Sequence, residues 1–335
     1  MGLACAFSTP TAYTLIQERV PADRASLASS LYGTGVAIGG GLASLSILLD
    51  GAIGWRESLI LISIFGIVSA GLSLTLLAND PKEEIIETTR DNGNDLTIYS
   101  EDSGPLSSVW QDVQECASTS RAQWLFLGSF LRFCSGLCIG VWSAPLFRSA
   151  FPDQQDNYAL VQAGITAVAS SISGLLGGSI ADKLIASNAE NEDVDAVGLG
   201  MWVPVVGSLL AAPAWYLAIQ LDQSFETAML WLTLEYLVAE CWFGPTISTL
   251  QATVGPKIGG TAQGLFTLTG AIANFAPAAL GFLYGQSTAT EGESSAKLTE
   301  LLVFGVCFGY IASAFCFAMA AQSPPSIDEE KVKTI

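Results

Sequence analysis

The chain has 335 residues, of which 50% are hydrophobic and only 13% are charged, and its mean hydropathy is +0.47. This composition excludes an ordinary soluble globular domain and indicates a membrane protein. The formal net charge of −18 opposes binding to nucleic acid, and it opposes attachment to anionic lipid surfaces through basic patches. We therefore expect membrane lipids as partners and no nucleic acid.

Apolar stretches with few or no charges recur along the chain, and most of them are long enough to cross a hydrocarbon core. In lipid such stretches satisfy their backbone hydrogen bonds as α-helices, so the sequence predicts an all-α integral membrane bundle. Nine transmembrane helices are predicted, in chain order, at about residues 1–17, 25–49, 57–78, 122–147, 158–181, 198–220, 227–250, 260–285 and 300–321.

The positions of Lys and Arg predict the orientation, because cytoplasmic loops carry an excess of these residues. If the loop after the first helix is cytoplasmic, nine Lys and Arg residues outside the helices lie on the cytoplasmic side and three on the other. The C-terminus is then cytoplasmic, and so is the acidic segment that follows the third helix. The predicted division is an incomplete N-terminal half (1–79), an acidic linker (80–120), a C-terminal half (121–322) and a tail (323–335).

An internal repeat relates the two halves. Residues 10–15 (PTAYTL) and 245–250 (PTISTL) share Pro, Thr, Thr and Leu, and similar sequences follow at 20–35 and 254–270. A chance match of small residues is the alternative, but the shared proline register favours duplication, and parallel repeats are typical of transporters. Three helices precede the second copy and none precedes the first, so three helices of an ancestral twelve are expected to be missing.

Several of these features together resemble the major facilitator superfamily. They are the two-half plan with an acidic linker, ERVPADR and GWRES beside helices, and GGSIADKL at 177–184. Two shorter stretches, GVWSAPLF at 140–147 and the segment at 239–266, resemble its spinster-like branch, which moves lipids or small organic ions. The resemblance implies a secondary transporter that works by alternating access, here reduced to helices four to twelve. The alternative is a truncated, non-transporting relative with an assembly or regulatory role.

Three charged residues lie deep within predicted helices: Arg132, Glu235 and Glu240. Ionisable residues at such depth face the bundle interior or a watery cavity, and they are functional candidates. At about 1.5 Å rise per residue, Arg132 and Glu240 both lie about 15 Å from the cytoplasmic ends of their helices. We expect them to pair across the central cavity that the resemblance places beside these helices; a purely structural ion pair is the alternative.

Glu235 lies five residues nearer the outer side and is rotated by roughly 140° from Glu240. Without a partner it suits a proton carrier, and the alternatives are contact with water or with Tyr or Ser groups. Trp142 and Trp242 lie near cavity-side positions and are predicted to touch an apolar part of the substrate. Arg132 in turn suggests an acidic or phosphate-bearing group.

Small residues are predicted to serve packing and gating. Gly35 and Gly39 are four residues apart and allow close helix packing, and Gly270 and Pro277 occupy the related face of the second copy. The resemblance to the family's loop signature assigns a gating role at the cytoplasmic helix ends to four further residues. They are Gly177, Gly178, Asp182 and Lys183.

Enzymatic readings have little support in this sequence. The chain contains no His, so the common nucleophilic systems that use His and the zinc-binding HExxH helix are excluded. We expect no enzyme activity, no cofactor and no metal site. The predicted function is transport of a small organic or lipid-like solute, with protons as a further candidate partner.

Overall fold

The computed structural model describes residues 9, 11–16, 19–77, 105–189, 191, 194–220, 223–255, 258–287 and 291–324. Throughout these residues the regular structure is helical, and no strand occurs. The predicted all-α class is therefore confirmed. The predicted helix over 1–17 lies partly outside the described residues. Residues 78–104 of the linker region and the tail from 325 lie wholly outside them.

Six stretches of the described chain are long and apolar enough to cross a membrane. Their bounds are Trp55–Thr75, Ser120–Ala150, Asn157–Asn188, Ala196–Ala218, Gly259–Gln286 and Ala296–Gln322.

Contacts divide the chain into two compact units, residues 45–108 and residues 1–44 with 109–335. The smaller unit contains the end of α2 (Ala25–Ile53) and all of α3 (Trp55–Leu77). Gly54 adopts the left-handed conformation with φ of 86° and separates these two helices. A residue without a side chain takes this conformation at little cost, so the glycine of GWRES permits α2 to end and α3 to begin here.

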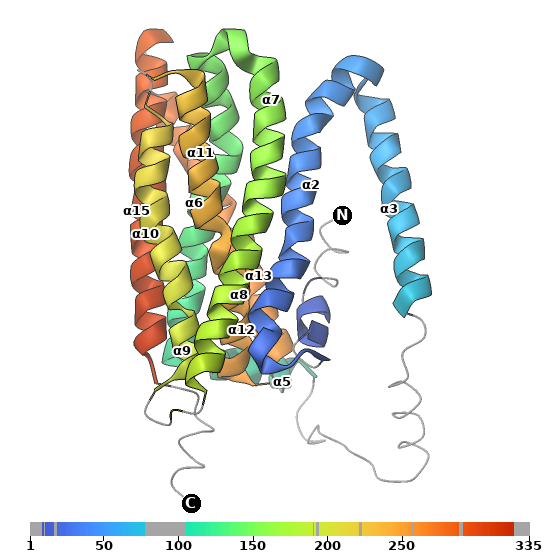
Figure 1. The fold of residues 1–335 in the computed structure, drawn as a ribbon, viewed down its shortest axis with the longest axis vertical. Helices are drawn as coiled ribbons and strands as arrows, with labels where there is room; N and C mark the ends of the chain where they lie inside the picture. The colour runs from blue at the N-terminus through green and yellow to red at the C-terminus, as the bar shows by residue number, and fades with distance from the viewer. Residues whose placement is uncertain are drawn as a thin grey trace, which may run out of the picture. The chain divides into compact units, whose positions relative to one another are not determined.

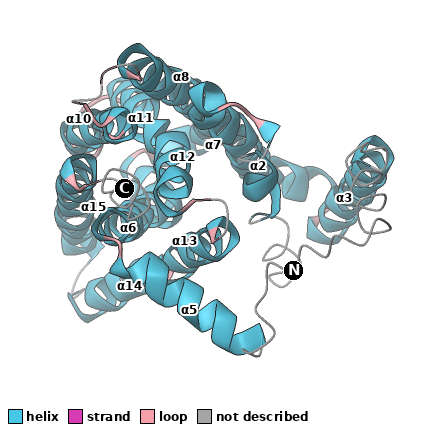
Figure 2. Ribbon diagram, turned by 90° about the horizontal axis from the view of Figure 1, so that it is seen from below, coloured by secondary structure: helices cyan, strands magenta, loops and turns pink. Residues whose placement is uncertain are grey.

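The larger unit is a helical bundle with α6 (Ser120–Ala150) and α15 (Glu291–Gln322) packed along each other, as Figures 1 and 2 show. α10 (Trp202–Ala218) also packs on α15. The fully buried Trp215 of α10 donates a hydrogen bond from Nε1 to the carbonyl of Leu302 at 3.3 Å. A buried indole needs such a partner, so Trp215 fixes α10 against α15.

Arg121 joins the beginning of α6 to the end of α15. Its buried side chain donates from Nε to the carbonyl of Ala320 at 3.2 Å and pairs with Asp195. Asp195 also caps α9 (Ala196–Gly200) by accepting from the Gly198 amide at 3.1 Å. These bonds satisfy a buried guanidinium and hold three helix ends together.

Three of the predicted helices contain breaks in their regular hydrogen bonding. The predicted 158–181 helix is α7 (Gln155–Gly164), a π-helical segment η3 (Ile165–Ala169) and α8 (Ser170–Asn188). The predicted 227–250 helix is α11 (Phe225–Ala239), the 3₁₀ turn η4 (Glu240–Trp242) and α12 (Phe243–Val254). The predicted 260–285 helix is α13 (Gly259–Ala273) and α14 (Phe275–Ser287).

A further helix, α5 (Pro105–Ser118), lies within the segment that the sequence indicated only as an acidic linker. Its inward side includes Val113 and the fully buried Cys116, and Asp112 accepts a hydrogen bond from Thr261 of α13 at 3.3 Å. Burial, with a smaller effect of the nearby Asp112 and Glu115 carboxylates, raises the pKa of the Cys116 thiol to about 11. The thiol is therefore protonated at neutral pH and serves packing.

Candidate functional site

An ion pair between α6 and η4 contains two of the three charged residues that the sequence singled out. Arg132 Nη2 lies 3.0 Å from Glu240 Oε1 and donates a second hydrogen bond of 3.0 Å to the Ala239 carbonyl. The Arg132 side chain is 2% exposed, whereas that of Glu240 is 34% exposed. The charged pair therefore presents its carboxylate outward and its guanidinium inward.

Aromatic rings cover the buried guanidinium of Arg132. Its Cζ lies 4.7 Å from the ring centre of Tyr310 and 5.6 Å from that of Trp242. Both distances suit a cation–π interaction, which adds stabilisation where water is excluded. Trp242 is only 4% exposed and packs edge-on against Phe133, with ring centres 5.0 Å apart. Trp242 thus contacts the cation directly, and its predicted contact with a substrate stays a prediction.

Glu235 has a tyrosine partner, as in one of the alternatives that the sequence left open, although the sequence did not identify which tyrosine. Its Oε1 accepts a hydrogen bond from the hydroxyl of Tyr310 on α15, and both side chains are buried. Its Oε2 has no hydrogen-bond partner among the described residues. Tyr310 therefore contacts both Glu235 and Arg132, and it brings the second carboxyl into the same buried cluster. A tyrosine in an apolar helix gives no sequence signal that distinguishes this role from packing.

The turn that carries Glu240 is held between two glycines of neighbouring helices. A Cβ added to Gly177 of α8 would lie 2.5 Å from the Cys241 carbonyl oxygen. One added to Gly207 of α10 would lie 2.3 Å from Cys241 Sγ and 2.5 Å from the Val238 carbonyl oxygen. Only glycine permits such close approach, so both neighbours must lack a side chain here. The break between α11 and α12 is thereby fixed in place.

Trp142 is engaged with α14. Its Nε1 donates to the carbonyl of Pro277 at 3.0 Å, and its ring lies directly over Gly281, where an added Cβ would be 2.8 Å away. The ring centre of Tyr284 lies 5.8 Å from that of Trp142. Pro277 thus contributes to packing through its carbonyl, and a substrate contact of Trp142 stays a prediction.

Asp182, from the predicted gating signature, caps the beginning of α2. Its Oδ1 accepts from the Ser26 amide at 3.0 Å and its Oδ2 from the Leu27 amide at 2.8 Å. The first amides of a helix lack partners within the helix and carry the positive end of its dipole, so a carboxylate is stabilised there. Asp182 connects α8 with α2, whereas Lys183 is exposed.

Close contacts of α2 with α8 and α12 surround this cap. A Cβ added to Gly178 would lie 2.6 Å from Ser30 Oγ, and one added to Gly244 would lie 2.0 Å from the same atom. The hydroxyls of Ser26 and Ser248 are 2.6 Å apart and share a hydrogen bond. The residues that hold this contact are thus small or hydroxylated, which allows backbones to approach closely.

The glycines predicted for helix packing differ in their surroundings. An added Cβ at Gly270 would lie 3.3 Å from the ring of Phe133, which is close contact. Gly35 and Gly39 are exposed, and no described atom lies within 4 Å of a Cβ added at either. Among the glycines of α2, Gly41 makes a close approach, because an added Cβ there would lie 2.7 Å from that of Ala167. Tight packing at Gly35 and Gly39 stays a prediction.

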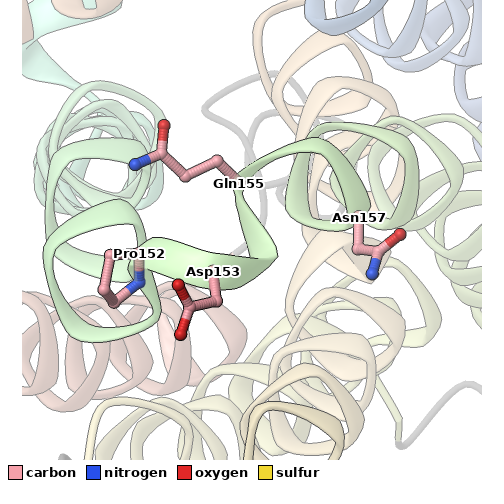
Figure 3. A pocket seen from close by; sticks show the side chains of 4 residues that line it. All are labelled: Pro152, Asp153, Gln155 and Asn157. Carbon is pink, nitrogen blue, oxygen red and sulfur yellow. The ribbon is translucent and has the colours of Figure 1, made fainter.

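A wide, open depression of about 480 Å³ lies at the turn between α6 and α7, lined by Pro152, Asp153, Gln155 and Asn157 (Figure 3). Gln155 accepts a hydrogen bond from Arg148 at 3.2 Å. Pro152, Asp153, Gln155 and Asn157 are exposed. The depression therefore lacks the enclosure of a solute site.

Comparison with known proteins agrees with this architecture. Residues 1–278 match the family model of the Major Facilitator Superfamily. The chain is also 24% identical over 328 residues to an MFS-type efflux pump of Mycolicibacterium smegmatis (strain ATCC 700084 / mc(2)155), covering 94% of this chain and 67% of the pump. Family and relative indicate membrane transport rather than enzyme activity. The chain is an integral, multi-pass membrane protein that belongs to the Major Facilitator Superfamily of transporters.

Proposed function

We propose that this chain moves a small organic or lipid-like solute across a membrane by alternating access, and that proton movement is coupled to transport. The observation that carries the proposal is the cluster of Arg132, Glu235, Glu240 and Tyr310. Ionisable groups are costly inside a membrane protein and are usually retained for transport or proton transfer. The relative from M. smegmatis is an efflux pump, and on that basis we propose export as the direction.

Charge counting supports proton coupling. The cluster contains one guanidinium and two carboxyl groups, and Arg132 pairs directly with Glu240. A second unpaired negative charge beside this pair would be expensive in a water-poor interior. The cluster is therefore neutral when Glu235 holds a proton, and the unpartnered Oε2 of Glu235 is the atom proposed to carry it. Release of that proton changes the net charge of the cluster and provides the coupling.

The contact of Asp182 with α2 supports alternating access. It links residues of the two proposed halves at one end of α2 through two backbone hydrogen bonds. Breaking it would separate α2 from α8 and α12 at this end and leave the helices themselves intact. We propose that the contact is closed in one state of the cycle and open in the other.

Orientation and branch belong to the same proposal. The excess of Lys and Arg supports a cytoplasmic position for the acidic segment 80–120, the Asp182 contact and the C-terminus. We propose membership of the spinster-like branch from the resemblance of the stretches at 140–147 and 239–266. The proposed halves remain 1–79 and 121–322, and the proposal equates the helices with the fourth to twelfth of the family plan.

Reconstitution into liposomes that contain the pH dye pyranine tests the proposal. Organic cations, organic anions and lysolipids are added in turn, for the chain as given and for one extended by three upstream helices. Solute-dependent proton movement that Glu240→Gln and Arg132→Ala both abolish supports the proposal. Proton movement that persists in both variants would show a purely structural pair. Binding without any movement in either form favours the non-transporting alternative.

A further inference from the structure

An unsatisfied amide lies outside the charged cluster, on α7. Gln162 is 9% exposed, and its Nε2 donates to the hydroxyl of Tyr236 at 3.2 Å and to Oγ1 of Thr166 at 3.3 Å. Both amide hydrogens are thereby used. The carbonyl oxygen Oε1 is buried and has no hydrogen-bond partner among the described residues. Burial of an unpaired acceptor costs about 1–3 kcal/mol, so its retention points to a partner other than the described residues.

Tyr236 connects this amide to the ion pair. It precedes Glu240 by four residues, so the two side chains lie on about the same face of α11 and its continuation, roughly 6 Å apart at Cβ. Glu235 is turned instead toward Tyr310 of α15. Gln162, Tyr236 and Glu240 therefore form one polar strip, and the side chain of Glu240 is 34% exposed.

The strip lies beside α2 and next to a π-helical segment. Thr166 belongs to η3, and segments of this kind occur frequently at functional sites. A Cβ added to Gly41 of α2 would lie 2.8 Å from the carbonyl oxygen of Ala163, one residue after Gln162. Gln162 thus lies where α2, α7 and α11 meet, at a boundary between the proposed halves.

We infer that this strip binds an amine or ammonium group of the transported solute. The carbonyl oxygen of Gln162 and the carboxylate of Glu240 are both acceptors, so the matching group donates hydrogen bonds and carries positive charge. Arg132 does not compete for the solute, because its side chain is 2% exposed behind Glu240. The inference rests on the proposed transport function. It replaces the acidic group that Arg132 suggested in the sequence with a basic one.

Two apolar cations provide the test. Ethidium carries aromatic amino groups that donate hydrogen bonds, whereas tetraphenylphosphonium has no donor. Their dissociation constants are measured by titration calorimetry with the full chain in lipid nanodiscs, without a gradient. We expect ethidium to bind more tightly, and Gln162→Leu to weaken ethidium by about tenfold, as for one hydrogen bond to a charged group. Binding of tetraphenylphosphonium should not change.

Gln220→Leu is the matched control. Gln220, just after the end of α10, lies outside the strip and donates from Nε2 to the Tyr216 carbonyl at 2.9 Å, so its loss should leave both dissociation constants unchanged. If Gln162→Leu does not fold, Tyr236→Phe keeps the ring but removes the hydroxyl that positions Gln162. That variant should lower the preference for ethidium over tetraphenylphosphonium.

Three results would overturn the inference. They are equal binding of the two cations by the wild-type chain, binding of neither, and equal weakening of both by Gln162→Leu. The assay needs no transport. Selective ethidium binding without solute-dependent proton movement would therefore reject the proposed function and keep the site. Transport of other solutes without ethidium binding would reject the site and keep the proposed function.

Discussion

Asp182 and Glu235 are both buried carboxyl groups, yet they are satisfied to different extents. Both oxygens of Asp182 accept backbone hydrogen bonds from the beginning of α2. Glu235 has one tyrosine partner and one oxygen without a described partner. A fully bonded carboxylate at a helix N-terminus fixes helices in place. A partly bonded carboxyl beside an existing ion pair is suited to gain and lose a proton. The difference therefore separates Asp182, a latch that holds α2 against α8, from Glu235, the proposed proton site.

Arg132→Leu breaks the charged cluster and should have the largest effect. It leaves Glu240 without its cation and removes the guanidinium that lies over the Tyr310 ring. Loss of one partner of a fully buried pair costs about 3–5 kcal/mol in the free energy of unfolding, and the 34% exposure of Glu240 puts the expected cost at the lower end of that range. Thermal unfolding in detergent should show a large drop in the melting temperature.

The double variant Arg132→Leu with Glu240→Gln serves as the control for that change. It removes both charges, so it should recover most of the stability while transport stays absent. Equal instability of the single and double variants would mean that Arg132 acts through its packing, against the charge-pair account.

Gly177→Ala disturbs α8, the helix that carries Asp182 and also contacts the turn with Glu240. Its new methyl group would overlap the Cys241 carbonyl next to Glu240, while the adjacent Gly178 contacts α2. Overpacking of this kind costs about 1–3 kcal/mol. We expect lower stability in thermal unfolding together with weaker transport. Gly305→Ala is the control, since no described atom outside its own helix backbone lies within 4 Å of a Cβ there, and a matching loss in that variant would contradict the steric explanation.

Asp182→Ala breaks the latch alone and should have the smallest effect on stability, about 1–2 kcal/mol, as for loss of a helix cap. Its main effect should be on the conformational equilibrium. A cysteine at Ser26 should become more accessible to a thiol reagent, because α2 loses its contact with α8. Lys183→Ala removes the neighbouring exposed charge and should leave accessibility unchanged. Equal labelling in the wild type and Asp182→Ala would exclude a gating role.

The sequence predicted the all-α membrane bundle and the level of the charged residues, because both follow from apolar length and from the constant rise of a helix. Counting residues from the helix ends placed Arg132 and Glu240 at one depth, and in the structure Arg132 Nη2 lies 3.0 Å from Glu240 Oε1. The sequence did not predict the turn at Glu240–Trp242 or the π-helical segment at Ile165–Ala169. Such breaks depend on contacts with neighbouring helices, such as that of Gly177 with Cys241, which no local pattern encodes.

Tyr310 and Gln162 illustrate the same limit at the level of single side chains. In sequence each is one polar residue in an apolar helix, and packing is the usual explanation of such a residue. Their roles appear only when α15 brings Tyr310 to Glu235 and when α7 brings Gln162 to Tyr236. Asp182 was assigned a gating role through the family resemblance, but its partners on α2 required the structure.

The most direct test of the proton site compares two transport modes of Glu235→Gln in the same proteoliposomes. Solute-driven proton movement is followed with pyranine, and exchange of labelled for unlabelled solute is followed without a gradient. Glutamine keeps the shape of the side chain but cannot release a proton, so we predict that proton movement is lost and exchange is retained. Unchanged proton movement in Glu235→Gln would contradict the account.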